Sequence, residues 1–222
     1  MQDIAEILKH LLSQPLPGEE AHKMMSSSKR FTGDIMPDPA KAKKSSVFIL
    51  LFKENGHWFI PLIKRPEYKG IHGGQICLPG GKFDDTDKDL LSTAYRETYE
   101  EVGVGKENII FAGTLSTLFI PNSNFNVTPQ VGVLKTIPEF RPDKREVEKI
   151  IKFPVSILFD RSKIKTFTKT VRGTTVTAPY YDFEGNQIWG ATAMILNEFA
   201  EVVKDTVLNE AENDLHLTRD KI

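Results

Sequence analysis

The sequence predicts an α/β (α+β) fold in which mixed β-sheets pack against helices. Apolar runs of strand length stand on both sides of residues 86–103, which have the 3.6-residue apolar spacing of a helix. Residues 192–203 repeat that spacing near the other end of the chain, so strands and helices alternate in layers. With 222 residues, 40% hydrophobic and 27% charged, the chain can bury a sizeable core.

The first 44 residues differ in composition from the rest of the chain. Residues 2–13 carry apolar side chains at helical spacing, which predicts a helix that docks on the body of the protein. Prolines, serines and scattered lysines follow, and they predict a long wrapping segment over residues 14–44. By composition, the expected parts are an N-terminal extension over 1–44, a main domain over 45–208 and a polar tail that frays over 209–222.

Strands are predicted where apolar runs are bounded by turn residues. A Lys-Glu-Asn-Gly turn signal at residues 53–56 joins the first two runs into a hairpin, and Arg172-Gly173 marks a second hairpin. A Pro-Gly-Gly turn at residues 79–81 follows the third run. The expected strands are residues 46–52, 58–63, 75–78, 108–118, 126–134, 163–170, 174–178 and 180–189. The loop 119–125 is polar and aromatic, and we expect it to line a pocket.

The helix over residues 86–103 is expected to begin at Thr86 or Asp87, either of which can cap it, and to end at Gly103. Its apolar face packs against the sheet. That face consists of Leu90, Leu91, Ala94, Tyr95, Thr98 and Val102.

Three carboxylates converge on one side of this helix. At 100° per residue, Glu97, Glu100 and Glu101 fall within an arc of about 100° beside the apolar face. Arg96 lies on the other flank, where it can pair with an acid and hold the helix to the preceding loop. Clustered carboxylates beside a Gly-Gly turn indicate a site for hard divalent metal ions, which take oxygen ligands and are often shared with a phosphate-bearing substrate. The alternative is an ordinary solvated helix face.

Composition also narrows the function classes. The net charge of −1 argues against a general nucleic-acid-binding protein, but not against a local nucleotide pocket. Cys77 is the only cysteine, so intramolecular disulfides are excluded and a reducing, cytoplasmic location is expected. No run approaches the ~20 apolar residues that span a bilayer. We therefore expect a small-molecule nucleotide as partner, no nucleic acid and no membrane, and a homodimer is compatible with the sequence.

Residues 81–104 resemble the Nudix box, the pattern G-x5-E-x7-R-E-U-x-E-E-x-G-U in which U is a bulky apolar residue. The second half matches, and reads Arg96-Glu97-Thr98-x-Glu100-Glu101-x-Gly103-Val104. The first half departs from the pattern, because Asp87 stands at the glutamate position and eight residues instead of seven separate it from Arg96. The resemblance implies a Nudix fold, with mixed β-sheets sandwiched between helices and the box holding metal ions in a loop-helix-loop.

A further resemblance, over about residues 46–200, is to the coenzyme A diphosphatases of this superfamily. Their signature before the box is roughly L-L-T-x-R-[SA]-x3-R-x3-G-x3-F-P-G-G. Arg65, Gly74 and the Pro-Gly-Gly turn keep that spacing, whereas Gly70 replaces the second arginine. The resemblance implies hydrolysis of coenzyme A to 3',5'-ADP and 4'-phosphopantetheine, with Mg²⁺ or Mn²⁺ as cofactor.

The resemblance and the carboxylate cluster together assign roles to individual residues. Glu97 and Glu101 are the expected direct metal ligands, with Glu100 as a ligand or a water-mediated partner. Glu97 is alternatively the general base. The other expected site residues are the Gly80 carbonyl as a further metal ligand, Glu146 as an extra ligand or base, Arg96 beside the catalytic acids, and Lys64, Arg65 and Gly74 for substrate binding.

Two other functions stay open from the sequence alone. The glycine at position 70 allows a Nudix hydrolase of another substrate, such as ADP-ribose or NADH. The altered first half of the box motivates a non-catalytic module that binds a nucleotide. The intact Arg-Glu-x-x-Glu-Glu run argues against the module, because a binding-only protein has no need of these acids.

Overall fold

The computed structural model describes the chain except for residues 31–34, 68–72, 172, 207 and 209–222, so Gly70 and the expected tail lie outside the described residues. The helices are α1 (Gln2–Leu12), α2 (Glu19–Met24), α3 (Leu90–Val102) and α4 (Gly190–Val203), with 3-10 helices η1 (Pro39–Lys41), η2 (Lys106–Asn108), η3 (Val155–Phe159) and η4 (Arg161–Lys163). The strands are β1 (Lys43–Glu54), β2 (His57–Lys64), β3 (Ile76–Cys77), β4 (Gly80–Lys82), β5 (Ile109–Thr114), β6 (Leu118–Ile120), β7 (Phe125–Leu134), β8 (Lys149–Pro154), β9 (Ile164–Val171), β10 (Thr174–Phe183) and β11 (Asn186–Trp189).

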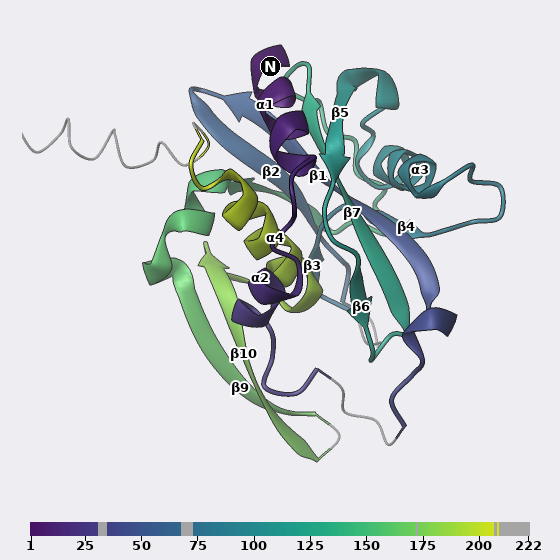
Figure 1. The fold of residues 1–222 in the computed structure, drawn as a ribbon, viewed down its shortest axis with the longest axis vertical. Helices are drawn as coiled ribbons and strands as arrows, with labels where there is room; N and C mark the ends of the chain where they lie inside the picture. The colour runs from purple at the N-terminus through teal and green to yellow at the C-terminus, as the bar shows by residue number, and fades with distance from the viewer. Residues whose placement is uncertain (31–34, 68–72, 172, 207, 209–222) are drawn as a thin grey trace, which may run out of the picture.

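β1 is the central strand of a mixed, eight-stranded sheet (Figure 1). It runs parallel to β7 and antiparallel to β2 and β4. The order along the main path is β3-β2-β1-β7-β5, with β4 beside β1, β6 beside β7 and β8 beside β2. A second sheet, in the order β11-β10-β9, is antiparallel throughout. The predicted mixed sheets are therefore confirmed.

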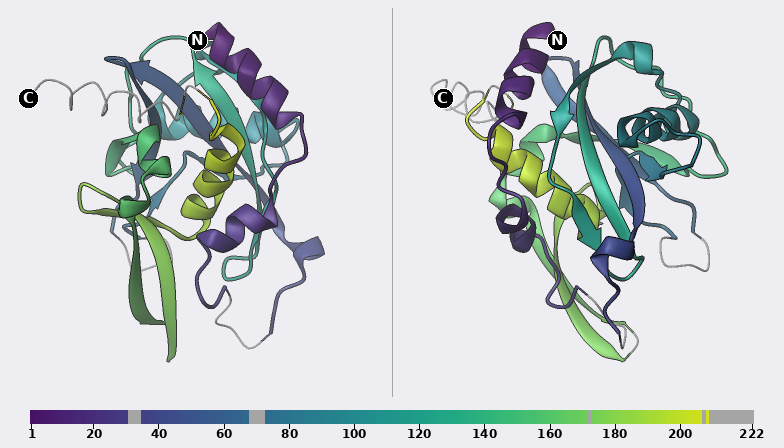
Figure 2. Two further views of the ribbon diagram at one scale, coloured as in Figure 1. Left: turned by 60° about the vertical axis from the view of Figure 1, so that its left-hand side comes forward. Right: turned by 45° about the vertical axis from the view of Figure 1, so that its right-hand side comes forward.

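Both faces of β1 are covered, which explains its unbroken apolar sequence. Side chains alternate between the faces of a strand. Phe48, Leu50 and Phe52 belong to the core cluster under α3, whereas Ile49 and Leu51 belong to the cluster that α1 and α4 cover. The right-hand view in Figure 2 shows α3 on one side of the sheet and α1 and α4 on the other. This is the expected arrangement of sheets between helices.

The N-terminal extension packs on the main domain, and its helices α2 and η1 were not expected from the sequence. α1 packs on β5, and α2 packs on α4. Beyond α2, Ser28 exchanges hydrogen bonds with the backbone of Thr177 on β10, at 2.8 and 3.0 Å. The guanidinium of Arg30 donates to the carbonyl oxygen of Phe119 at 2.6 Å.

A buried carboxylate on α4 fixes the extension. Glu198 is fully buried and accepts the backbone N–H groups of Gly18 and Ser116, each at 3.2 Å. Its other oxygen lies 2.8 Å from Nε2 of His22, on α2. Burial alone would raise the pKa of Glu198, but the hydrogen bonds from His22 and Ser116 outweigh burial and hold the pKa below its usual value.

We expect Glu198→Gln to lower the free energy of unfolding by about 1–3 kcal/mol at pH 7, because hydrogen bonds to a buried charge are lost. A carboxyl with a lowered folded-state pKa stabilises the fold above its unfolded pKa, and that contribution is lost as the pH falls through the folded pKa. The deficit of the variant should therefore shrink below about pH 4.3, the ordinary glutamate value. Urea unfolding at pH 7 and pH 3.5 measures both effects. Glu201→Gln, which removes only an exposed pair with Lys204, is the control, and a deficit that grows with acid would contradict the assignment.

The expected bounds of two strands and one turn are wrong, and strand pairing in the structure explains each difference. The run 108–118 is split into β5 and β6, because each part pairs with a different stretch of β7. The run 180–189 is not one strand but the end of β10 and β11, joined by a turn in which Glu184 and Gly185 have positive φ. The expected turn at residues 79–81 ends in β4, where Gly80 and Gly81 pair with β1.

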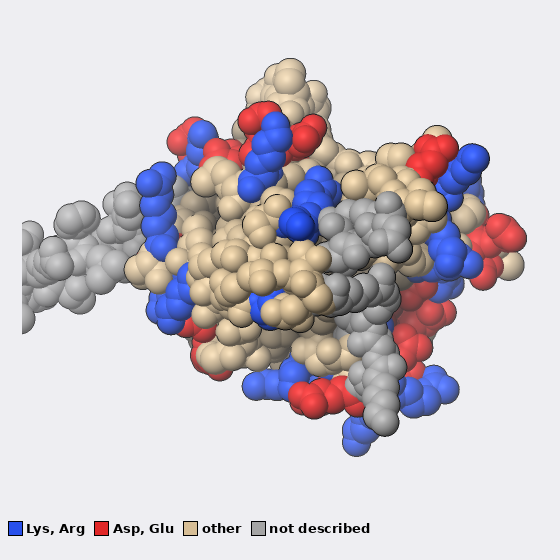
Figure 3. Space-filling model, turned by 90° about the horizontal axis from the view of Figure 1, so that it is seen from below, with Lys and Arg blue, Asp and Glu red and all other residues tan. Residues whose placement is uncertain are grey.

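The described surface carries both signs of charge. On the face seen in Figure 3, acidic and basic side chains lie around the rim, and the middle is largely uncharged with a few basic side chains in it. Among the described residues, no helix has the length and apolar character needed to cross a membrane.

Candidate active site

Glu101 is the most buried of the expected acids, with 1% of its side chain exposed. One carboxylate oxygen accepts the backbone N–H of Gly80 at 2.8 Å, and the other lies 3.1 Å from Nη2 of Arg65. Burial raises the pKa of Glu101 to about 7, although the Gly80 N–H and Arg65 both act to lower it. β4 and the end of β2 thus supply the two groups that position this carboxylate.

Glu97 lies one turn earlier on the same side of α3. Its carboxylate lies against Gly81, where the Cβ of any other residue would overlap it, so the second glycine of the turn leaves room for this acid. Burial raises the pKa of Glu97, and Arg96, which donates to it at 2.8 Å, acts in the opposite direction. Repulsion from Glu100 and Glu146 raises the pKa further.

Arg96 joins the loop before α3 to the acids on the helix. Its Nε and Nη2 donate to the two oxygens of Asp87, each at 2.9 Å, and its Nη1 donates to Glu97 and, at 3.1 Å, to Glu100. The bidentate pair holds the pKa of Asp87 well below its usual range. The expectation that Arg96 ties the helix to its loop is confirmed. Asp87 reaches it despite the shorter side chain and the extra residue.

The start of α3 corrects the expected cap. The helix begins at Leu90, and Asp89 is its N-cap, accepting the backbone N–H of Ser92 at 2.7 Å. Thr86 and Asp87 do not cap the helix, because the Thr86 hydroxyl bonds to Asp84 and the Asp87 carboxylate is engaged by Arg96. The end at Gly103 is confirmed by its left-handed conformation.

We expect Asp87→Asn to lower kcat by about tenfold, because Arg96 then loses a charged partner and no longer fixes Glu97. Asp87→Glu keeps the charge and should retain most of the activity. Steady-state kinetics of both variants measure the effect, with Asp85→Asn in the same exposed loop as control. Equal losses in the Asn and Glu variants would show that the pair with Arg96 does not matter.

Glu100 and Glu146 lie at a cavity of about 590 Å³ beside the end of α3. The backbone N–H of Arg141 donates to the carbonyl oxygen of Val102, and that of Asp143 donates to the backbone carbonyl oxygen of Glu101. The segment before β8 is therefore held against the end of the helix. Glu146 is thereby brought close enough to Glu97 and Glu101 to raise the pKa of both. The structure thus gathers all four expected acids on one side of α3.

The three expected substrate-binding residues are separated. Arg65 lies on Glu101, whereas Lys64 is turned to Glu148, with its Nζ 2.7 Å from the carboxylate. Lys64 and Arg65 are thus held by different acids in this structure. Gly74 donates its N–H to Pro66 at 3.1 Å and closes the loop that follows Arg65.

The donor set fits a hard divalent cation. Glu97, Glu101 and Glu146 repel one another, and carboxylate and backbone carbonyl oxygens are the ligands that Mg²⁺ and Mn²⁺ take. The described residues do not hold three such side chains in a ready coordinating group. Arg96 and Arg65 account for this, because their guanidinium groups bind Glu97 and Glu101 and set where these carboxylates point.

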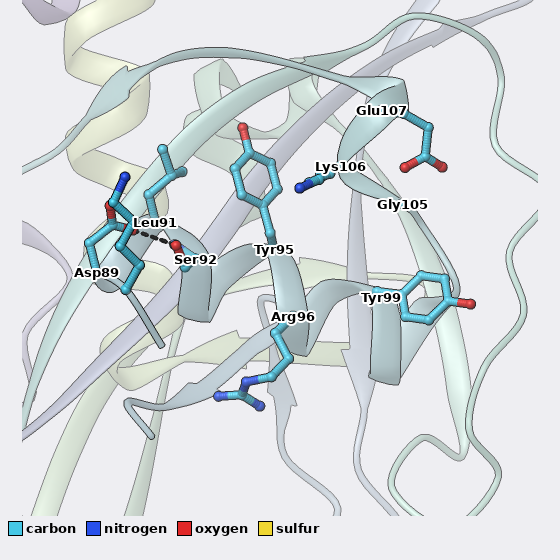
Figure 4. Close-up of a pocket in the computed structure, with 10 residues that line it drawn as sticks. Asp89, Leu91, Ser92, Tyr95, Arg96, Tyr99, Gly105, Lys106 and Glu107 are labelled. Carbon is cyan, nitrogen blue, oxygen red and sulfur yellow. Dashed lines mark hydrogen bonds between the residues drawn. The ribbon is translucent and has the colours of Figure 1, made fainter. Parts of the chain in front are cut away.

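A second cavity, of about 520 Å³, lies on the opposite flank of α3 (Figure 4). Ser92 and Tyr95 line it. At 100° per residue they lie more than about 130° around the helix from Glu97. Arg96 and Tyr99 also line this cavity, and they are the residues through which it adjoins the side of α3 that carries the gathered acids.

Sequence reasoning missed Arg141 and Arg145, which line the cavity at Glu100 and Glu146. The segment 138–146 shows only charge and prolines in the sequence. Its position depends on backbone hydrogen bonds to the end of α3. Such contacts cannot be predicted from a local sequence pattern.

The family model described as the NUDIX domain matches residues 42–163, more than half of the chain. The chain belongs to the Nudix family. It is similar to Nudix hydrolase 15, mitochondrial, of Arabidopsis thaliana, with 31% identity over 173 residues that cover 75% of this chain and 60% of the plant protein. It is also similar to a Nudix hydrolase named NudL from Photorhabdus laumondii, with 32% identity over 143 residues, 64% of this chain and 76% of that one.

A solved Nudix structure shares the fold. The Nudix hydrolase RenU from M. smegmatis aligns with a TM-score of 0.53 and 14% identity, over 73% of this chain and 86% of that one. The chain spans 60% of the plant Nudix relative, so the likeness to that protein concerns the matched part. The expected Nudix fold is confirmed.

Proposed function

We propose that this protein hydrolyses a nucleoside diphosphate linkage with the aid of Mg²⁺ or Mn²⁺, and that its substrate is coenzyme A. The products would be 3',5'-ADP and 4'-phosphopantetheine. The observation that carries the proposal is the gathering of Glu97, Glu101 and Glu146 beside the Gly80-Gly81 turn in a Nudix chain. The spacing of Arg65 and Gly74 before the box supports coenzyme A as the substrate.

The acids would hold the cation through Glu97, Glu101, Glu146 and the carbonyl oxygen of Gly80, with Glu100 reaching it through water. When bound, the cation neutralises phosphate charge, polarises phosphorus and lowers the pKa of water. Glu97 or Glu146 accepts the proton of the attacking water, since both are carboxylates beside the gathered acids.

Two arginines complete the proposed chemistry. Arg96 keeps Glu97 and Glu100 in place through its bidentate pair with Asp87. Arg65 shares Glu101 with the backbone of Gly80, so when Glu101 holds a cation the Arg65 guanidinium would be able to turn toward a substrate phosphate.

A substrate panel tests the proposal. Purified protein is incubated with coenzyme A, ADP-ribose or NADH in Mg²⁺ or Mn²⁺, and the products are identified by mass spectrometry. We expect coenzyme A to give the highest kcat/KM. If ADP-ribose or NADH is cleaved and coenzyme A is not, the substrate is wrong and the hydrolase stands. Tight binding of a nucleotide without turnover of any diphosphate would favour a binding module instead.

A further inference from the structure

The cavity at Glu100 and Glu146 has other lining residues that the proposed hydrolysis does not use. These two acids line the cavity together with Tyr99, Gly103, Arg141, Asp143 and Arg145. At about 590 Å³ it has the volume of a small-molecule site. A group of the substrate that extends from the cleaved diphosphate would enter this space first.

Tyr99 is a large aromatic side chain that the core does not hold. Its exposed fraction is 64%, and it lines both cavities beside α3, so it forms the ridge between them. Figure 4 shows the ring projecting from α3 on the far side of Arg96 from Asp89, well away from Tyr95. An accessible aromatic ring next to catalytic acids offers a surface on which a nucleobase can stack.

Arg141 is positioned by the end of α3. Its backbone N–H donates to Val102 at 2.9 Å. Gly103 is left-handed, and a Cβ there would lie 2.7 Å from the Cβ of Arg141, so the helix ends in the residue that admits this close approach. The Arg141 side chain is 76% exposed, and its guanidinium pairs with Glu139, whose side chain is 84% exposed. Such an exposed pair contributes little and is readily exchanged for a phosphate.

The Arg145 side chain is exposed too, at 87%, but its ion pair is bidentate. Its Nε and Nη2 contact both oxygens of Asp143, the closest at 2.6 Å. This bidentate pair lowers the pKa of Asp143 to about 2. Of the two arginines that line the cavity, Arg141 has the weaker ion pair and is therefore the one that can best bind an anionic ligand.

We propose that Tyr99 and Arg141 form the subsite for the nucleotide half of the substrate. The base stacks on Tyr99, and a phosphomonoester on the ribose pairs with Arg141. The ligand class is a nucleotide that carries a phosphate outside the cleaved diphosphate. This inference rests on the proposed function, because it takes the acids beside the same cavity, Glu100 and Glu146 among them, as the site of cleavage.

Binding of the product half tests the subsite without turnover. Calorimetry compares 3',5'-ADP with 5'-AMP, which lacks the 3'-phosphate, on the wild type and on Arg141→Gln. We expect the wild type to bind 3',5'-ADP about tenfold more tightly, and the variant to bind both nucleotides equally, because one charge-assisted hydrogen bond is lost. Lys144→Gln removes a neighbouring exposed charge that does not line the cavity and should preserve the preference.

Kinetics with coenzyme A and dephospho-coenzyme A separate the inference from the proposed function. Arg141→Gln should lower kcat/KM about tenfold for coenzyme A only. Tyr99→Ala should raise KM on the order of tenfold for both substrates, while Tyr99→Phe stays close to the wild type. Equal binding of the two nucleotides by the wild type, or an unchanged preference in Arg141→Gln, overturns the subsite. Absence of turnover with an Arg141-dependent preference in binding overturns the hydrolase and leaves the subsite standing.

Discussion

Glu101→Gln is expected to lower kcat on the order of a thousandfold, because an amide is a poor ligand and several kcal/mol of charge stabilisation by the cation are lost. The fold should tolerate the change. Glutamine has nearly the same shape, and its amide oxygen can still accept the Gly80 N–H, but its amide nitrogen would face the Arg65 guanidinium, so we expect a modest fall in melting temperature. Burial already disfavours the charged form of Glu101, since it raises the pKa to about 7, so the neutral side chain suits the site.

Three measurements check this variant: kcat with Mg²⁺ and with Mn²⁺, the melting temperature, and Mn²⁺ binding followed by electron paramagnetic resonance. Glu54→Gln, which removes an acid paired with Lys152 at the sheet surface, is the control for a lost carboxylate. Turnover near the wild-type rate would remove Glu101 from the cation site. A large fall in melting temperature would mean that its role is structural.

Arg65→Gln is expected to change cation binding and catalysis in opposite directions. Mn²⁺ should bind about fivefold more tightly, since two like charges a few Å apart near a protein surface repel by at least about 1 kcal/mol. kcat/KM should nevertheless fall about 10- to 100-fold, because a charge-assisted hydrogen bond to the substrate phosphate is lost. If Arg65 had only a structural role, its replacement would not tighten cation binding.

The stability of the Arg65 variant gives an independent reading. Without the guanidinium, Glu101 keeps only the Gly80 N–H of the two contacts described for it, so the melting temperature should fall in the absence of divalent ions. Added Mn²⁺ should restore more stability in the variant than in the wild type. Lys152→Gln, an exposed lysine on β8, is the matched control. Weaker Mn²⁺ binding in Arg65→Gln would show that the arginine supports the cation instead of competing with it.

The helix and its acids could be predicted from the sequence because both depend on local spacing. The period of 3.6 residues placed Glu97, Glu100 and Glu101 on one side of α3, and Gly103 marked its end. The strands around β1 were equally readable, because their apolar runs are bounded by turn residues. These features need no knowledge of distant parts of the chain.

What the sequence did not reveal depends on partners far away in the chain. The cap of α3 is a local exception, because Asp89 accepts the N–H of Ser92, three residues further on. β5 and β6 are separate strands because β7 pairs with both. Arg141 lines the cavity because its backbone bonds to the end of α3. Pairings of this kind are set by the tertiary structure, which single-residue spacing does not encode.

The fastening of α2 to α4 also constrains the order in which the protein folds. His22 and Glu198 are 176 residues apart in the chain, so a ribosome must add and release all of the intervening residues before this pair can form. Until then, the sheet face that α1 and α4 share lacks its last cover. Closing so long a loop is slow, and the wait exposes apolar surface to aggregation. We therefore expect the yield of folded protein to fall when synthesis is fast and the temperature is high.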